Sequence, residues 1–377
     1  MKSKHFLSGS MLASVCLMLL AACGNSNTAA TRTQSGSYLV HNLVSDGAVP
    51  ADHTDPNLKN PWGIAFNLSP GPIGPDWVAN NGTNTSTLYD GTGAGFPPVV
   101  PLVVSIPAGK NGAANPTGVV YNGSTDFLVL QGGDAGPAMF IFSGEGGTIA
   151  AWTMIGVSLF NAQTVYDDGA GGAVYKGLAI ANNGSGNFLY ATDFHNNKID
   201  VFDTHFAKVT SKGTFKDPQL SAGYAPFGIQ AIQGKLYVTY ALQKAPANHD
   251  EVDGTGLGFV DVYDADGNMI QRLASAGPLN APWGLTMAPA NFGPFSNDLL
   301  VGNFGDGTIN AYDPASGNWL GNLKASNGTP VQIPQLWGLA FGNGNQNQAA
   351  NTLFFAAGIN DEADGLYGSI VAVPTSH

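Results

Sequence analysis

The sequence predicts an all-β fold made of one four-stranded unit repeated six times. The chain of 377 residues holds 51 Gly and 23 Pro, and only 11% of its residues are charged. Average globular domains have about 25% charged residues, and a surplus of glycine and proline favours strands joined by tight turns. No stretch keeps an apolar period of 3.6 residues over three helical turns. Six copies of about 50 residues with four strands each are typical of a six-bladed β-propeller with four-stranded antiparallel blades.

The repeat is marked by a glycine inside its first apolar run. The clearest copy contains Pro282-Trp283-Gly284-Leu285. The marker glycines lie 55, 59, 51, 56 and 54 residues apart, at Gly63, Gly118, Gly177, Gly228, Gly284 and Gly338. Because glycine allows another backbone to come close, we expect this strand to be the innermost one of each blade, where the blades meet around the axis.

Two further apolar runs follow each marker and predict the second and third strands. The second strands are expected at residues 76–79, 127–130, 188–191, 235–238, 298–301 and 352–355. The third strands are expected at residues 86–89, 139–142, 199–202, 259–263, 309–312 and 369–372. Four third strands are followed by Asp90, Asp203, Asp264 and Asp313, whose carboxylates can accept backbone N–H groups in the turn to the fourth strand.

The sixth copy runs out of sequence after its third strand. Residues 38–44 precede the first copy, alternate between apolar and polar side chains, and have no other place in the repeat. We expect this N-terminal strand to be the fourth strand of the last blade, which would close the ring and pair an edge that would otherwise be exposed.

The first residues have the layout of a secretory signal. Lys2 and Lys4 precede an apolar run that is too short to span a bilayer as a mature helix, and the run ends in Leu20-Ala21-Ala22-Cys23-Gly24. This ending resembles a bacterial lipobox, which implies that residues 1–22 are a lipoprotein signal peptide and that Cys23 is acylated. The alternative is a plain signal peptide cut after Ala22.

The lipobox resemblance predicts that the protein is anchored to a membrane, and it predicts a cellular location. Several acyl chains on Cys23 would anchor the protein stably. Residues 25–36 have no apolar side chain larger than alanine, so we interpret residues 23–36 as a flexible tether to a propeller of residues 37–377. The expected location is the cell envelope after export, at the outer membrane in a Gram-negative cell.

Charge and cysteine content exclude several classes of function. The formal net charge is −12, and removal of residues 1–22 takes away two lysines and no acid. An acidic surface argues against nucleic acid as a partner, because phosphates need basic patches. The two cysteines are Cys16 and Cys23, so the body has no thiol for disulfides, thiolate catalysis or zinc binding. We expect a monomer.

The repeat resembles known six-bladed propellers. A Pro-x-Gly-Ile/Leu-Ala strand, a Leu-Tyr-Val strand and a strand such as Ile199-Asp200-Val201-Phe202-Asp203 are similar to NHL-repeat and gluconolactonase-like propellers. The segment Asn60-Pro61-Trp62-Gly63-Ile64-Ala65 looks closest to an uncharacterised family of exported bacterial propeller proteins. One propeller scaffold hosts hydrolases, lyases, sensors and docking platforms, so the resemblance implies a fold more firmly than an activity.

Candidate site residues come from loops that should emerge on one face, before the first strands and after the second strands. In the gluconolactonase-like enzymes a divalent ion is held at the axis by Asn, Asp and Glu, so the resemblance makes Asn80, Asp193 and Asn303 the candidate ligands of Ca²⁺ or another divalent cation. Oxygen ligands of this kind suit Ca²⁺ or Mg²⁺. Gln131 and Asp134 are expected on the same face. No acidic residue opens the first strand of the first copy, where such enzymes place a Glu. The alternative is that turns simply need these residue types.

The catalytic candidates are two single residues. His195 is either an ordinary loop residue or, with Asp193 and Asn196 beside it, a metal ligand or general base. Lys176 stands where the other copies have Trp, Phe or Thr. It could attract an anionic ligand, or it could lay its stem over apolar surface with its ammonium in water.

Three tryptophans and an acidic insertion each allow more than one interpretation. The tryptophans Trp62, Trp283 and Trp337 are expected in the core between blades and not in a binding cage. The acidic insertion at residues 249–253 could cover the mouth of the axis, bind a cation, or be a solvated loop.

Two functions fit this sequence. The first is a lipid-anchored propeller that binds a small-molecule or protein ligand without converting it. The second is a divalent-metal-dependent hydrolase, lactonase or lyase with its site on the loop-rich face.

Overall fold

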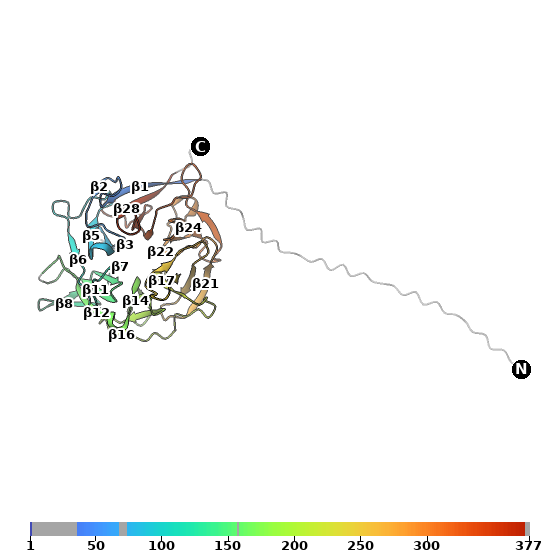
Figure 1. Ribbon diagram of the computed structural model, residues 1–377, viewed down its shortest axis with the longest axis horizontal. Helices are drawn as coiled ribbons and strands as arrows, with labels where there is room; N and C mark the ends of the chain where they lie inside the picture. The colour runs from blue at the N-terminus through green and yellow to red at the C-terminus, as the bar shows by residue number, and fades with distance from the viewer. Residues whose placement is uncertain (2–35, 68–73, 157, 374–377) are drawn as a thin grey trace. The chain divides into compact units, whose positions relative to one another are not determined.

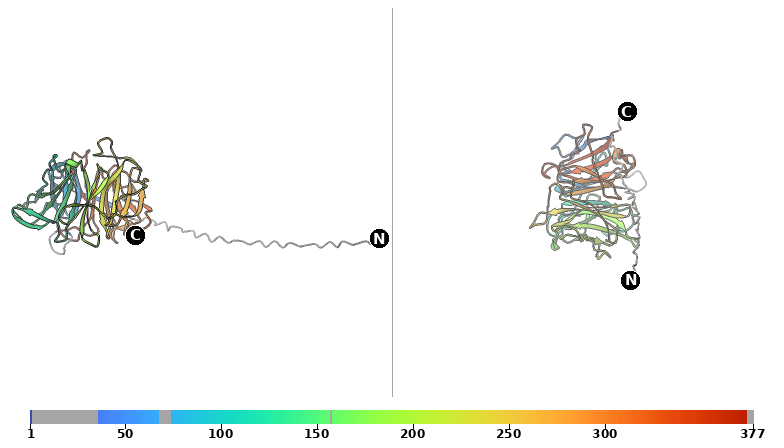
Figure 2. Two further views of the ribbon diagram at one scale, coloured as in Figure 1. Left: turned by 90° about the horizontal axis from the view of Figure 1, so that it is seen from below. Right: turned by 90° about the vertical axis from the view of Figure 1, so that its right-hand side faces the viewer.

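The six predicted blades are present. A computed structural model describes residues 1, 36–67, 74–156 and 158–373, with 28 strands, three short 3-10 helices and no α-helix among them. The predicted signal peptide, Cys23 and the tether up to residue 35 lie outside these residues. No helix of the described part is long and apolar enough to cross a membrane. Figure 1 shows the small sheets arranged in a ring, and in side view their strands run through the thickness of the ring (Figure 2).

Four blades follow the expected order, with the innermost strand first and the outermost last. They are blade 1 with β3 (Pro61–Phe66), β4 (Asp76–Asn80), β5 (Thr85–Tyr89) and β6 (Val103–Ser105); blade 3 with β13 (Tyr175–Asn182), β14 (Asn187–Asp193), β15 (Lys198–Phe202) and β16 (Lys208–Val209); blade 4 with β17 (Tyr224–Ile232), β18 (Lys235–Gln243), β20 (Phe259–Tyr263) and β21 (Met269–Ser275); and blade 5 with β22 (Pro282–Met287), β23 (Leu299–Asn303), β24 (Ile309–Tyr312) and β25 (Trp319–Asn322). In blade 4 the short strand β19 (Glu251–Val252) also pairs with β18.

Blade 2 differs from the prediction. Its order is β7 (Pro116–Tyr121), β10 (Phe140–Gly144), β11 (Thr148–Trp152) and β12 (Gln163–Asp167). The predicted second strand at residues 127–130 is wrong, because β8 (Leu128–Gln131) pairs only with β9 (Asp134–Pro137) in a separate hairpin. The run predicted as the third strand is the second. The loop from the second to the third strand is therefore residues 145–147, and Gln131 and Asp134 do not belong to it.

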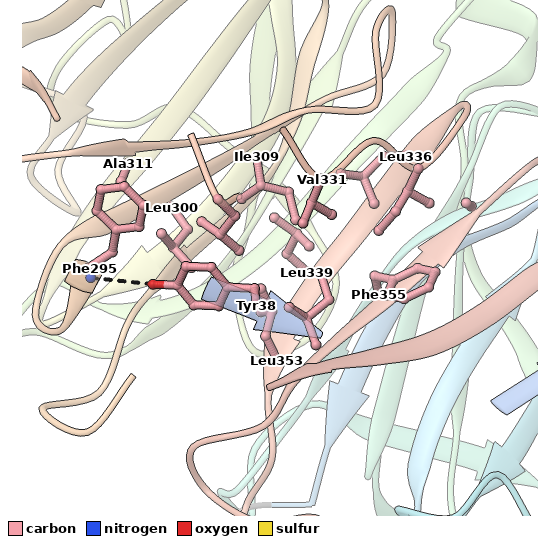
Figure 3. Close-up of a cluster of buried hydrophobic side chains, with 14 of the residues drawn as sticks. Tyr38, Phe295, Leu300, Ile309, Ala311, Val331, Leu336, Leu339, Leu353 and Phe355 are labelled. Atoms are coloured by element: carbon pink, nitrogen blue, oxygen red, sulfur yellow. Dashed lines mark hydrogen bonds between the residues drawn. The ribbon is translucent and has the colours of Figure 1, made fainter. Parts of the chain in front are cut away.

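The N-terminal strand closes the ring as predicted. Blade 6 consists of β26 (Leu336–Phe341), β27 (Leu353–Ala357), β28 (Leu366–Val373) and β1 (Ser37–Ser45), and β2 (His53–Thr54) extends it. β1 and β28 are antiparallel from the pair Ser37 and Val373 to the pair Ser45 and Leu366. Figure 3 shows Tyr38 of β1 inserted among buried side chains, with its hydroxyl accepting a hydrogen bond from the Phe295 N–H at 3.4 Å.

The four aspartates that follow third strands have the predicted role in turns. Each carboxylate accepts N–H bonds from the backbone two to four residues further on; an example is Asp264, whose Oδ1 lies 3.0 Å from the Asp266 N and 2.8 Å from the Asn268 N. Asp90, Asp203 and Asp313 bind their turns in the same way.

The marker glycines lie where the blades meet, as expected. A Cβ placed on Gly63 would lie 2.7 Å from the Thr117 O and 2.8 Å from the Val119 N of the neighbouring inner strand. Every other marker glycine is similarly close to the backbone of the next blade, and Gly338 of blade 6 is close to Trp62 of blade 1. The repeat therefore keeps glycine because the packing around the axis leaves no room for a side chain.

We expect Gly63→Ala to destabilise the propeller by about 1–3 kcal/mol, because the added methyl overlaps backbone atoms that cannot move independently. Gly186→Ala is the matched control, since a Cβ there would meet nothing closer than a Phe188 ring carbon at 3.9 Å. Urea denaturation measures both. Equal midpoints for the two variants would show that the inner strands are less tightly packed than described.

Candidate functional site

An aromatic plug fills the axis at the face where the inner strands begin. Trp62 stacks on Trp337 with ring centroids 3.4 Å apart, and Trp283 meets both rings edge-on at 5.8 and 5.9 Å. Phe194, Phe227 and Phe304 belong to the same cluster. The prediction that the three tryptophans are core residues is confirmed.

Lys176 is the one cationic residue in this layer of inner-strand side chains. It is only 1% exposed, and its ammonium lies 5.0 Å from the Trp62 ring centroid. Its Nζ lies 2.5 Å from Glu145 Oε1, and the other oxygen of Glu145 accepts a hydrogen bond from Asn81 Nδ2 at 2.8 Å. The ammonium therefore does not reach water over apolar surface, and it is already neutralised by a carboxylate of the protein.

Further carboxylates surround this ion pair. Asp250 and Glu251 come from the insertion of blade 4 and Glu362 comes from the loop between β27 and β28, and the charge of Lys176 acts on all three. We call the set of Glu145, Lys176, Asp250, Glu251 and Glu362 the axial mouth. Four carboxyl groups thus share one ammonium.

Burial and charge separate the pKa values of these groups. Burial favours the neutral form of Glu145, but the charge and hydrogen bond of Lys176 outweigh it and lower its pKa. Burial and the charge of Glu251 raise the pKa of Glu362 to about 7, and burial also raises the pKa of Glu251. For Lys176, burial favours the neutral amine, but the charges of Glu145 and Glu251 raise its pKa and keep it an ammonium. Near neutral pH the axial mouth therefore holds both ionised and protonated carboxyl groups.

A cavity of about 290 Å³ is lined by neighbours of the axial-mouth residues: Asp253 lies two residues after Glu251, and Gln335 donates a hydrogen bond at 3.2 Å to Asp361, the residue before Glu362. Its polar lining consists of Asp253, Asp306, Gln332 and Gln335, and Phe304 joins it to the aromatic plug, because the Phe304 ring lies 4.2 Å from that of Trp337. Its volume is near the lower end of the range for small-molecule sites.

The predicted metal ligands are placed at equivalent positions, the ends of second strands, and each is engaged in its own blade. Both carboxylate oxygens of Asp193 accept hydrogen bonds, from the Val174 N and from Asn196 Nδ2. Asn303 Oδ1 accepts a bond from the Asn280 N. Of the three candidates, Asn80 alone has a side-chain oxygen, Oδ1, that accepts no hydrogen bond from the described residues.

The oxygens of Asp193 and Asn303 already accept hydrogen bonds within their blades. No group of three His, Cys, Asp or Glu side chains in the described ranges is placed to hold a metal ion. Binding of Ca²⁺ or another divalent cation stays a prediction.

His195 supports the blade 4 insertion. Its Nδ1 lies 2.9 Å from the Ala247 O, and the Gln243 side chain donates to the backbone oxygen of His195 at 3.2 Å. The insertion itself reaches the axial mouth, where His249 Nδ1 lies 4.0 Å from Glu145 Oε1. The insertion is therefore not simply a solvated loop: it lies at the mouth and brings the carboxyl groups of Asp250 and Glu251 to it.

Glu145 was missed as a site residue. The sequence predicts the second strand of this copy at residues 127–130 and the third at residues 139–142, and this order places Glu145 after the third strand, in a loop on the opposite face. The available signal was the short turn Gly144-Glu145-Gly146-Gly147, which joins the apolar run of residues 139–142 directly to a second apolar run at residues 149–152.

Comparison with known proteins gives the family. No family model matches the chain. An uncharacterized protein of Acanthamoeba polyphaga mimivirus is 33% identical over 367 residues, which cover 93% of this chain and 85% of that protein. A second uncharacterized protein of the same virus is 32% identical over 348 residues, covering 90% and 87%. The chain belongs to the family of these viral proteins.

Solved structures show the fold that this family shares. Streptogramin B lyase is similar with a TM-score of 0.51 at 15% identity, covering 89% of this chain and 97% of that one. A glucose dehydrogenase matches with a TM-score of 0.51 at 12% identity, covering 90% and 100%. A protein of unknown function from Bacteroides thetaiotaomicron matches with a TM-score of 0.53 at 11% identity, covering 89% and 76%. At these identities the likeness extends to the propeller fold alone.

Proposed function

We propose that the protein is a ligand-binding propeller whose axial mouth and adjoining cavity bind a small organic cation. On this proposal it is exported, and a lipid on Cys23 holds it in the cell envelope. The observation that carries the proposed ligand class is the excess of carboxyl groups around Lys176.

Electrostatics support a cationic ligand. Glu251 and Glu362 have raised pKa values because burial and like charges disfavour their ionised forms. A cation in the cavity would lie near Asp253 and Asp306. Its charge would favour ionisation of Glu362, because the cavity residue Gln335 contacts Asp361, the residue before Glu362. The Phe304 ring adds an apolar wall whose face attracts cations.

A hydrolase or lyase is the second candidate. Glu145, with a lowered pKa, and Glu362, with a pKa of about 7, form a pair of carboxyl groups that differ in protonation near neutral pH. Such a difference is the usual basis for assigning a general base and a general acid. A divalent cation at Asn80, Asp193 and Asn303 belongs to this candidate.

The test is a thermal-shift series with 1,5-diaminopentane, neutral 1,5-pentanediol and anionic glutarate. We expect only the diamine to raise the melting temperature, because a ligand that binds the folded state stabilises it. The shift should be smaller at pH 6 than at pH 8, since Glu362 gains a proton and loses its charge as the pH falls through about 7. Asp253→Asn and Glu362→Gln should reduce it.

Asp134→Asn is the matched control, because Asp134 is an exposed acid on the β8–β9 hairpin, outside the axial mouth. Equal shifts with all three compounds, or an undiminished shift in both site variants, would contradict the proposal. If the purified protein instead retains Ca²⁺, and EDTA lowers its melting temperature unless Asp193 is replaced by Ala, the metal-dependent enzyme becomes the better candidate.

A further inference from the structure

Exposed apolar side chains gather at the outer edge of blades 1 and 2. Eight of them come from three segments, and we call them the rim patch: Val99, Val100, Leu128, Leu130, Met154, Ile155, Leu159 and Phe160, each between 44% and 92% exposed. Figure 1 shows β8, which carries Leu128 and Leu130, at the outside of the ring near β6 and β12.

Contacts join the three segments into one surface. The Gln131 side chain of β8 donates to the Ser158 O at 3.2 Å, and a Cβ on Gly136 of β9 would touch Ile155. The Ser105 N of β6 donates to the Phe160 O at 2.8 Å. Phe96, Pro97 and Leu102, on either side of Val99 and Val100, line one cavity together with Met154 and Leu159, so the three segments that carry the rim patch are neighbours.

The patch is backed by an apolar cavity of about 150 Å³ between the two blades. Trp77, Phe140 and Trp152 form its floor, and Met154 and Leu159 belong to both the cavity and the rim patch. A side chain from a partner could therefore be buried beneath the surface, which is how anchoring residues act in stable interfaces.

The size of the patch exceeds what a monomer usually exposes. From their exposed fractions, the eight residues present roughly 800 Å² to solvent, which is about what each partner buries in a stable interface. Soluble monomers rarely expose a contiguous apolar patch of more than a few hundred Å².

Charge indicates which partner fits. The chain has 26 acidic and 14 basic residues, yet residues 94–105, 127–133 and 151–163 contain no charged residue. Two copies would repel each other over most of their acidic surface but not here. An anionic membrane surface would need lysine or arginine at the patch, but the charged residues that flank Leu128 and Leu130 in the sequence are the acids Asp126 and Asp134.

We infer that the rim patch is a homodimer interface, in which two copies pack these side chains against each other around a twofold axis. An isologous contact requires a surface that complements itself, and an apolar patch with two outward-facing leucines and an apolar cavity beneath it meets that requirement. Both axial mouths remain open in such a dimer, so it is independent of the ligand proposed above. The sequence alone led us to expect a monomer, and the same experiment decides between the two.

Sedimentation equilibrium of the full chain tests this inference, together with the variants Leu130→Glu and Val99→Glu. We expect the parent protein to form a dimer at micromolar concentration and each variant to weaken dimerisation at least tenfold. Ile270→Glu is the control, because Ile270 is 46% exposed on blade 4, outside the patch, and should leave the dimer unchanged. The parent protein and its variants carry the same N-terminal residues. Any difference in dimerisation between them therefore comes from the substituted side chain.

Circular dichroism would confirm that the variants remain folded, as substitutions of exposed side chains should allow. A parent protein that stays monomeric up to about 100 µM overturns the inference, since a buried area of this size is expected to hold a dimer well below that concentration. Dimerisation that is equally strong in Leu130→Glu and Val99→Glu overturns it as well, as does loss of the dimer in Ile270→Glu alone.

Discussion

Deletion of residues 37–45 is expected to abolish cooperative folding of the propeller. The deletion removes β1, so β28 loses its outer partner along its whole length, keeps only β27 on its inner side, and becomes an exposed edge. It also removes Tyr38 from the core cluster of blades 5 and 6, and Leu43 and Val44 from the cluster between blades 6 and 1. Loss of the thermal transition, followed by circular dichroism and tryptophan fluorescence, is the expected result.

A chain that starts at Gly36 is the control and should melt like the full protein. Tyr38→Ala is a milder form of the same test, with an expected loss of about 3–5 kcal/mol for a buried aromatic side chain. Tyr38→Phe removes only the hydroxyl, which donates to the Phe292 O at 3.0 Å, and should cost about 1 kcal/mol. An unchanged melting temperature after the deletion would show that β1 does not close the ring.

Much of the fold could be predicted because each blade repeats its local chemistry. Glycine at the axis is required because the backbones of neighbouring inner strands come close together. Aspartate after the third strand is required because its carboxylate accepts N–H groups of the following turn. Both requirements recur in several copies. Blade 2 was misassigned because Leu128-Val129-Leu130 has the composition of a buried strand. In the structure Val129 is buried while Leu128 and Leu130 point outward, so the run belongs to an inserted hairpin. Composition alone does not distinguish these two placements.

The candidate site was harder to predict, because its residues come from four different blades and become neighbours only when the blades close into a ring. Lys176 stood out by breaking the aromatic pattern of its position. Its partner Glu145 is 31 residues earlier in the chain, in the preceding blade. Glu251 and Glu362 lie near it only because an insertion of blade 4 and a loop of blade 6 both extend to the axis. No local spacing encodes these long-range contacts.

Replacement of Lys176 by Met should have the second large effect on stability. The substitution leaves Glu145 buried without its counter-ion, and breaking a buried ion pair in this way costs about 3–5 kcal/mol. The double variant with Glu145→Gln should recover much of this loss, because a neutral amide can keep the hydrogen bond to Asn81 and has no charge to desolvate. Lys212→Met is the control. Lys212 is 70% exposed and 3.1 Å from Asp266, so its pair should contribute at most about 1 kcal/mol.

The pH dependence distinguishes a lost ion pair from a simple packing defect. In Lys176→Met the pKa of Glu145 should rise above its value in the unfolded chain, because burial is then no longer opposed by the ammonium. The folded variant would bind more protons than the unfolded chain, so its stability should fall as the pH rises and should be partly restored at about pH 5. Urea denaturation at pH 5 and pH 8 measures this difference. If Lys176→Met lost no more stability than Lys212→Met, or the same amount at both pH values, the ammonium would not be what keeps Glu145 ionised at the axis.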